Sequence, residues 1–167
     1  MEWGVDAATA TEELFAMYHN ELYRYVRFSL RNQTAAEDLV QDIFLQVLKS
    51  WGQYRGDASP KTWLWTIARN CVVDYTRKHI RDRLRDLFID EVGGVAQAPG
   101  TAAIEAEELM RCVTGDQRQV VVLRVLQDWS ISDTAKILGW SESKVKTTLH
   151  RAIEKMRREG GGDDGRL

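Results

Sequence analysis

Apolar residues recur at helical spacing along most of the chain, and this pattern predicts three helices in the N-terminal half. The first begins near Thr11, the second begins at Thr34, and the third begins at Pro60 and ends near Arg85. Their apolar faces are, in order, Leu14, Tyr18, Leu22, Tyr25, Val26 and Phe28; Leu39, Ile43, Val47 and Trp51, with Phe44 and Leu48 beside them; and Leu64, Ile67, Ala68, Cys71 and Tyr75. We therefore expect a small helical bundle in this half.

Polar residues at the expected helix starts support these assignments. Thr34 is the predicted N-cap of the second helix, and Glu37 three residues later completes a capping box. Ser59 is the predicted cap of the third helix, with Pro60 in its first turn. The chain has only two prolines and lacks hairpin signals of the Asn-Gly type. The predicted fold class is all-α, with two small helical domains.

The composition changes between residues 86 and 108, where six acidic residues occur without a lysine or arginine. The stretch VGGVAQAPGTAA within it is typical of a linker. The acidic residues that follow suit the first turn of a helix, because carboxylates are favourable near a helix N-terminus. We predict a first domain at 1–85, a flexible acidic linker at 86–108, a second helical domain at 109–159 and a disordered tail at 160–167.

Two short helices separated by a glycine turn are predicted within the second domain. Ser132 is the predicted cap of the first, Gly139 suits a left-handed corner, and Ser141 is the predicted cap of the second. The second helix is basic, with six Lys or Arg and one Glu from Lys144 to Arg158. This arrangement is typical of a helix-turn-helix whose second helix enters a DNA major groove. An ordinary helical hairpin with a solvated charged face is the alternative.

The polar face of the helix that begins at Pro60 combines an aromatic ring, arginines and an amide. Such a face suits unpaired DNA, because rings stack on bases, arginines bind phosphate and an amide reads a base edge. The alternative is a tryptophan-rich edge of the core, since tryptophan is usually mostly buried. The residues of this face are Trp65, Arg69, Asn70, Val73, Thr76 and Arg77, and the basic stripe continues through Arg81, Arg83 and Arg85.

The overall composition argues against several classes of protein. Net charge is −2, an average that hides the basic helix described above. Cys71 and Cys112 lie far apart without a CxxC pattern, against a zinc site or a disulfide framework. No signal peptide or bilayer-spanning run is visible, so we expect a cytoplasmic protein. No nucleophile–base pattern or phosphate-binding glycine loop occurs, so neither an enzyme nor a cofactor is expected.

Two long stretches resemble conserved regions of the extracytoplasmic-function (ECF) sigma factors of the sigma-70 family. Region 2 is similar to AAEDLVQDIFLQVLKSWGQYRGDASPKTWLWTIARNCVVDYTRK, and region 4 is similar to DQRQVVVLRVLQDWSISDTAKILGWSESKVKTTLHRAIEKMRR. The resemblance covers about residues 11–158, in the order of the family. It implies a protein without catalytic activity that binds core RNA polymerase and directs it to promoter DNA.

The resemblance also implies roles for particular residues. For docking on the clamp helices of the largest polymerase subunit, these are Glu37, Asp38, Gln41, Asp42 and Phe44. For the −10 element they are Arg55, Gly56, Asp57, Ala58, Ser59, Lys61, Trp65, Arg69, Asn70 and Arg77. For the −35 element they are Arg124, Ser143, Lys144, Lys146, Thr147, His150 and Arg151. The loop before Pro60 would accept a base flipped from the −10 element, Asn70 would read the upstream edge of the same element, and Arg124 would reach phosphate.

Further partners and alternative functions follow from the same comparison. The family implies contact with the polymerase flap and control by an anti-sigma factor, which is often membrane-anchored. The chain departs from the family pattern at residues 113–115, where a Leu-Pro pair is usual, and at Ser143 and Lys144, where glycine and threonine are usual. Two other functions stay open, a stand-alone helix-turn-helix regulator and a helical adaptor that binds only protein.

Overall fold

The computed structural model describes residues 6–30, 32–86 and 107–160, which form helices joined by turns and short loops. The chain divides into two compact units, Met1–Gln97 and Ala98–Leu167. No strand occurs among the described residues, and the predicted all-α fold class is confirmed. The predicted linker and tail lie almost wholly outside the described residues.

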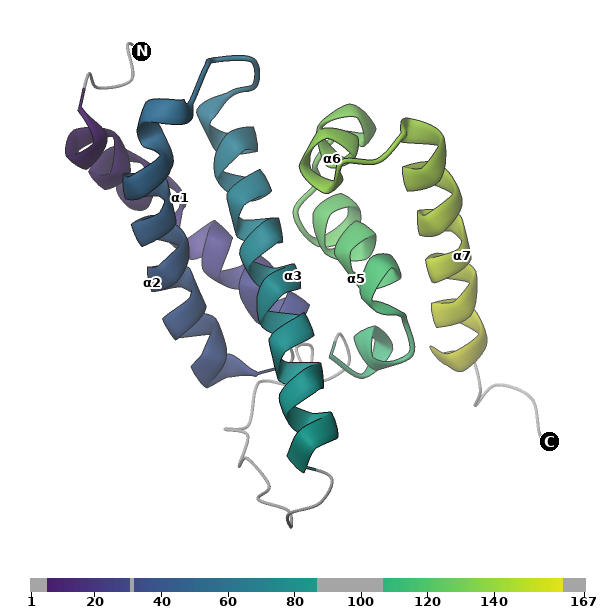
Figure 1. Cartoon of the computed structure of the whole chain (residues 1–167). Helices are drawn as coiled ribbons and strands as arrows, with labels where there is room; N and C mark the ends of the chain where they lie inside the picture. The colour runs from purple at the N-terminus through teal and green to yellow at the C-terminus, as the bar shows by residue number, and fades with distance from the viewer. Residues whose placement is uncertain (1–5, 31, 87–106, 161–167) are drawn as a thin grey trace, which may run out of the picture. The chain divides into compact units, whose positions relative to one another are not determined.

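Three helices form the first unit. They are α1 (Ala7–Leu30), α2 (Gln33–Ser50) and α3 (Pro60–Asp86), and a single 3-10 turn, η1 (Trp51–Gln53), follows α2 (Figure 1). Each of the three helices contacts the other two. The buried residues of α1 and α2 are Ala10, Leu14, Leu22, Tyr25, Val26, Ala36, Leu39, Val40, Ile43, Phe44 and Val47. The predicted apolar faces of these two helices thus supply most of the core of the unit.

The third helix is rotated relative to its predicted apolar face. Its buried apolar positions are Leu64, Trp65, Ala68 and Val72, and Thr62 is buried with them. Its half-buried positions include Ile67, Cys71 and Tyr75. The Trp65 ring packs edge-on against Tyr18 of α1, with ring centroids 6.0 Å apart, and lies 6.4 Å from the Tyr25 ring. An edge-to-face pair of this kind is favourable in addition to the area it buries, so the indole is drawn into the core.

The observed cap of α2, Asn32, lies two residues before the predicted cap, Thr34. Asn32 has an extended backbone, and its side-chain oxygen accepts a hydrogen bond from the Ala35 N–H at 3.2 Å. The predicted capping box of Thr34 and Glu37 is wrong, because Thr34 already lies inside the helix. Asparagine and threonine both favour the cap position, so the sequence offers two possible caps here. The helix begins after the earlier one, Asn32.

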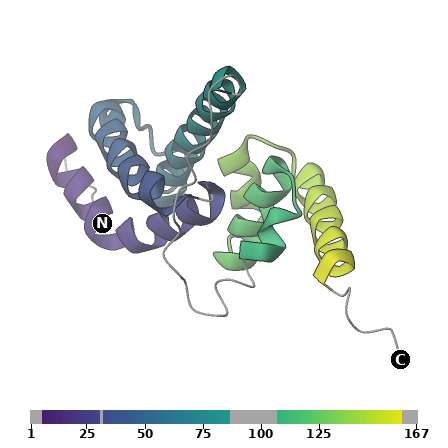
Figure 2. The same ribbon diagram turned by 90° about the horizontal axis from the view of Figure 1, so that it is seen from below.

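Helices α5 (Gly115–Val121), α6 (Ile131–Leu138) and α7 (Glu142–Gly160) belong to the second unit, together with the helical residues 107–111. A π-helical turn, η2 (Val122–Leu126), continues α5. Helix α7 packs against both α5 and α6, as its course beside them in Figure 2 shows. The buried apolar residues here are Met110, Val113, Val120, Val121, Val122, Leu123, Trp129, Ala135, Ile137, Leu138, Val145 and Ala152.

The turn between α6 and α7 has the geometry that the sequence predicts. Gly139 has φ of 67°, in the left-handed region that glycine adopts without a steric cost. The next amide, that of Trp140, donates to the Ala135 carbonyl at 3.0 Å and closes the end of α6. Ser141 Oγ accepts the Lys144 N–H at 3.1 Å, so its predicted role as the cap of α7 is confirmed. These contacts make α6 and α7 a helix-turn-helix.

The cap of α6 is Ser130 and not the predicted Ser132. Ser130 has an extended backbone, and its hydroxyl oxygen accepts the Asp133 N–H at 3.0 Å. Ser132 is exposed within the first turn of the helix. Both serines lie close to the apolar residues of α6. Ser130 is the cap because its backbone is extended, whereas Ser132 is already helical.

Replacing the two serines separately tests this assignment. We expect Ser130→Ala to lower the free energy of unfolding by about 0.5–2 kcal/mol, because an orphan amide at the helix start loses its partner. Ser132→Ala is the matched control and should change it by less than about 0.5 kcal/mol. Urea unfolding of the full chain, followed by circular dichroism, measures both. Equal losses would contradict the cap at Ser130.

Candidate functional site

The outward face of α2 carries the acidic side chains that were predicted to meet a protein partner. Its exposed polar residues include the predicted Glu37, Asp38, Gln41 and Asp42, and Gln46 and Lys49 are exposed farther along the helix. Phe44, predicted with them, is only 6% exposed, and its ring packs 5.0 Å from that of Phe15 in α1. This prediction is therefore corrected: Phe44 stands on the side of α2 that faces α1, and it stabilises the contact between these helices.

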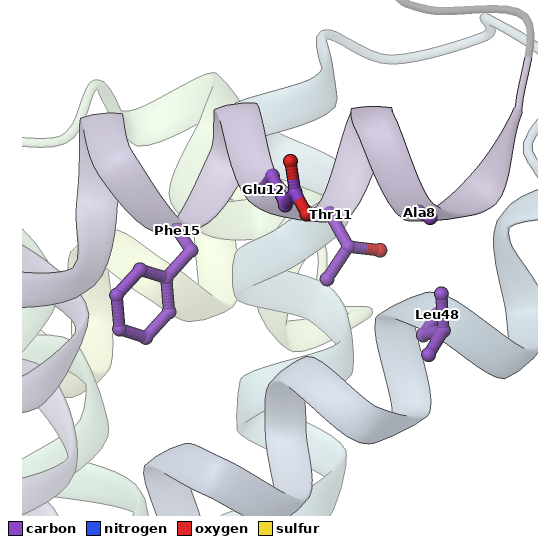
Figure 3. Close-up of a pocket in the computed structure, with 5 residues that line it drawn as sticks. All are labelled: Ala8, Thr11, Glu12, Phe15 and Leu48. Carbon is purple, nitrogen blue, oxygen red and sulfur yellow. The ribbon is translucent and has the colours of Figure 1, made fainter.

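Exposed apolar side chains adjoin this acidic face. Leu45 and Leu48 are 52% and 40% exposed, and Phe15 is 47% exposed. An open groove of about 510 Å³ lies between α1 and α2, and Figure 3 shows the residues that line it, Ala8, Thr11, Glu12, Phe15 and Leu48. Neighbouring exposed apolar residues mark a binding surface. Leu45 was not among the residues predicted for this surface, although its helical spacing from Asp38 and Asp42 places it on the same side of α2.

One tyrosine closes the loop between η1 and α3. The Tyr54 hydroxyl donates to the Ala58 carbonyl at 2.6 Å, and Gly56 makes the bend with φ of 78°. Burial and the nearby Asp57 carboxylate raise the pKa of the Tyr54 phenol, which favours the protonated hydroxyl that donates this bond. The exposed residues of the loop are Arg55, Gly56, Asp57 and Ser59, and Ala58 is half-buried. The loop is thus a closed polar turn with most of its side chains in solvent.

Three aromatic rings pack together beside this loop. The Tyr54 ring lies 5.1 Å from that of Trp51 and 5.2 Å from that of Trp63, measured between centroids. The two tryptophan rings are 5.6 Å apart. Ser59 follows, and its hydroxyl accepts a backbone N–H from the first turn of α3 at 3.1 Å, which confirms its predicted role as a cap. The two ends of the loop are therefore held by packing and by a helix cap.

Trp65 and Lys61, both predicted to contact DNA, face α1 instead. Trp65 is fully buried, so its ring has no face to offer a base. The Lys61 ammonium lies 2.8 Å from a Glu21 carboxylate oxygen and 5.4 Å from the ring centroids of both Tyr18 and Trp65. A cation above aromatic rings and beside a carboxylate is stabilised where it stands. The prediction for Trp65 is corrected, because its buried ring holds α3 to α1. The DNA contact predicted for Lys61 stays a prediction.

Asn70 and Arg77 occupy exposed positions farther along α3, as predicted. Arg69, which directly precedes Asn70, is half-buried, and its Nη1 donates to the Asn70 side-chain oxygen at 3.3 Å. The Arg69 Nε is buried, so this end of the side chain extends toward the core. Burial raises the pKa of the Tyr25 phenol strongly, and the Arg69 charge opposes that rise. The hydrogen bond orients the Asn70 amide and leaves its NH₂ group for another acceptor.

The predicted outward face of α7 is exposed along its whole length. Its residues are Ser143, Lys144, Lys146, Thr147, His150 and Arg151. Val145 and Ala152 are buried on the opposite side against the rest of the unit. One acidic residue joins the outward face, since Glu154 lies 3.2 Å from His150 Nε2. The face is therefore basic and polar, with one acidic residue paired to a histidine.

Arg124 has a different environment from the one predicted. It is half-buried, its Nη1 donates to the Trp129 carbonyl, and its Nε is buried without a hydrogen-bond partner. The Trp129 N–H in turn donates to the Leu123 carbonyl at 2.9 Å, across a turn in which Asp128 has φ of 54°. The guanidinium holds the turn that leads into α6, and the phosphate contact predicted for Arg124 stays a prediction.

Two kinds of site are missing from the part of the chain that the structure describes. There, no group of three or more His, Cys, Asp or Glu side chains is arranged to hold a metal ion. Within the same residues, every helix is too short or too polar to cross a membrane. The surfaces described above are thus the candidate sites in these residues.

Comparison with known families gives two matches that cover more than half of the chain. Sigma-70 region 2 matches residues 14–82, and Sigma-70, region 4 matches residues 104–156. The ECF RNA polymerase sigma factor SigX of Bacillus subtilis (strain 168) is 38% identical over 157 residues, which cover 87% of this chain and 80% of SigX. RNA polymerase sigma factor YlaC of the same organism is 33% identical over 151 residues, 84% of this chain and 86% of YlaC.

Two solved structures share the fold. The sigma factor RpoE in complex with the anti-sigma factor NepR from Bartonella quintana has a TM-score of 0.79 at 22% identity, covering 91% of this chain and 97% of RpoE. CnrH in complex with the cytosolic domain of CnrY has a TM-score of 0.74 at 21% identity, covering 94% and 91%. At these identities the likeness shows the fold alone.

The closed loop before α3 gives a prediction that is independent of any partner. Tyr54→Phe removes the hydrogen bond to Ala58 and keeps the ring contacts with Trp51 and Trp63. We expect amide hydrogen exchange at residues 55–59 to become about 2- to 12-fold faster, since such a bond is worth about 0.5–1.5 kcal/mol. Exchange in α7 is the internal control. Unchanged exchange in the loop would show that packing alone closes it.

Proposed function

The chain belongs to the extracytoplasmic-function sigma factors of the sigma-70 family, and we propose that it divides the work of a sigma factor between surfaces on its two units. As a sigma factor, it directs RNA polymerase to promoter DNA. One observation carries the division of roles: the first unit exposes an acidic and apolar face on α2, and the second exposes a basic face on α7. Surfaces of opposite charge suit different partners, a basic protein and a duplex.

The α2 face is the proposed docking surface for core polymerase. Asp38 and Asp42 supply exposed negative charge, and Leu45 and Leu48 supply exposed apolar area beside it. A basic amphipathic helix pair, such as the clamp helices of the largest polymerase subunit, would find both kinds of contact there. Opposite charges speed the encounter, while the apolar side chains supply the area that is buried in the complex.

The loop at residues 55–59 and the exposed part of α3 are the proposed −10 surface. Taking a base out of the stack costs a few kcal/mol, which a pocket must return through its contacts. The bond from Tyr54 to Ala58 closes the loop before DNA arrives, and this lowers the entropy lost on binding. Farther along α3, Asn70 offers an oriented amide that can read a base edge, and Arg77 offers a positive charge for phosphate.

Helix α7 is the proposed reader of the −35 element. Lys146, Thr147, His150 and Arg151 are exposed on its outward face, opposite the buried Val145. A helix-turn-helix inserts this face into the major groove, where each base pair presents a distinct set of donors and acceptors. The second unit is also the proposed contact for the polymerase flap.

We extend the proposal to the regulation and location of the protein. RpoE, which shares the fold, was solved with an anti-sigma factor bound, and we propose that such a factor also covers the α2 face of this chain. Because RNA polymerase works in the bacterial cytoplasm, this chain would act there. The chemistry of transcription belongs to the polymerase, so no catalytic activity is assigned to this chain.

A reconstitution experiment tests the proposed function as a whole. The purified full chain should comigrate with core polymerase and permit transcription that depends on a promoter. A stand-alone regulator would instead bind duplex DNA without core enzyme. Selection of active promoters from templates with randomised −35 and −10 elements would then define the sequences that the chain prefers.

Charge reversal on α2 tests the polymerase-facing surface. We expect Asp38→Arg with Asp42→Arg to weaken binding to core polymerase by at least about 10-fold, because like charges across an interface are strongly unfavourable. Both residues are exposed, so the free energy of unfolding should change little. The control reverses Asp74 and Glu159, which changes net charge equally at other exposed sites. A pull-down titration in which both double variants bind alike would remove the assignment.

Two alanine variants test the separation of −10 and −35 roles. Arg151→Ala should weaken binding to a matched −35 element roughly 10- to 100-fold, as expected for a lost base contact. Asn70→Ala should leave that binding nearly intact and reduce open-complex formation, and a pre-melted template should recover part of the loss. Gel shifts and permanganate footprinting, both with core enzyme, measure the two steps. Equal losses of closed-complex binding, with an unchanged melted fraction, would refute separate roles.

A further inference from the structure

Trp140 stands in the turn between α6 and α7 with its backbone fixed on both sides. Its N–H donates to the Ala135 carbonyl at 3.0 Å, which ties it to the end of α6. The next residue, Ser141, accepts the Lys144 N–H at 3.1 Å and begins α7. The half-buried Trp140 ring therefore has a defined position at the start of the recognition helix before any partner binds.

The Lys144 ammonium lies on this ring, 3.9 Å from its centroid. Such a distance is well within the range of about 6 Å in which a cation is attracted to an aromatic face. Lys144 belongs to the first turn of α7, where the positive end of the helix dipole disfavours a lysine charge. The aromatic face offsets this cost and orders a side chain that would otherwise move freely in solvent.

The position of Lys144 around α7 indicates what its charge can reach. Residues two apart on a helix point about 200° apart, so Lys144 and Lys146 stand on opposite edges of the outward face. Ser143 and Thr147, one turn apart, lie between these edges. When a helix occupies the major groove, side chains at its edges meet the sugar–phosphate backbone, and those between them meet base edges.

We propose that Trp140 is a positioning residue that holds the Lys144 ammonium at one edge of α7 for contact with a DNA phosphate. The pair adds affinity without reading sequence, and it sets how deeply the start of the helix enters the groove. This inference rests on the proposed function, because it assigns Trp140 and Lys144 to the −35 surface of α7. It also separates Lys144 from the base-reading residues with which the sequence groups it.

Promoter binding by the full chain with core polymerase tests the inference. Dissociation constants would be measured over a range of KCl on a matched promoter and on promoters with single changes in the −35 element. Lys144→Gln should weaken binding by the same factor on every promoter and reduce the slope of log affinity against log salt by about one. A change in the order of preference among the −35 sequences would show that Lys144 reads a base, and would overturn the inference.

Changes at Trp140 complete the test. Trp140→Leu should weaken binding about 2- to 5-fold with the salt slope retained, since the lysine is still present but no longer held. Trp140→Phe, which keeps an aromatic face, should retain most of the affinity. In the Lys144→Gln background, Trp140→Leu should have no further effect. An equal loss in that background would show that the ring only packs, and would overturn the positioning role.

A measurement on the unmodified chain covers the case in which Trp140→Leu disturbs folding. A lysine methylene above an indole ring has an NMR signal shifted upfield, and Lys144→Gln should abolish that signal. Its absence from the free chain would overturn the contact. Arg151→Ala distinguishes the two levels of failure. If it still weakens binding at a matched −35 element while the Trp140 and Lys144 effects simply add, only this inference fails. If it has no effect and promoter-dependent transcription is absent, the proposed function fails.

Discussion

Burial of the Trp65 ring is the constraint on which the first unit depends. The indole lies against Tyr18 and Tyr25 of α1, and it fixes how α3 is rotated about its own axis. A fully buried large side chain contributes about 1.5–3 kcal/mol, which is a substantial part of the stability of a small domain. Rotation then decides which side chains reach solvent. Asn70 is exposed, whereas Lys61 is turned toward Glu21. The proposed −10 surface is thus a consequence of core packing.

The sequence predicts the helices well because apolar spacing and capping chemistry are local properties. Gly139 and Ser141 were identified in this way, since a left-handed corner and a helix cap each require particular residue types. Aromatic side chains were harder to assign. Phe44 and Trp65 stand at the border between buried and exposed faces, and the choice there depends on what the neighbouring helix offers. Periodicity treats one helix at a time: it placed Phe44 beside the apolar face of α2 and Trp65 on the polar face of α3, but it could not predict the α1 rings that each contacts.

Long cationic side chains show the same limit for the candidate sites. Lys61 and Arg124 stand in regions where DNA-binding residues are expected, yet each is held by a partner within the chain. Their flexible stems reach several ångströms in any direction, and the nearest acceptor is a property of the fold. Arg151 and Lys146, by contrast, project from a helix whose opposite side is buried, so their exposure follows directly from spacing. The role of a charged side chain is therefore predictable from sequence where the helix allows it to point only toward solvent.

The groove between α1 and α2 has a consequence for how the protein persists when it is idle. Phe15 and Leu48 are exposed to water there when no partner is bound. A partner that covers them removes this apolar area from water, which is favourable. Whatever binds the groove binds the folded unit, and at a concentration 100 times its dissociation constant it adds about 2.7 kcal/mol to the stability of that unit. A larger supply of binding partners therefore raises the fraction of chains that are folded, and folded chains are less open to proteolysis.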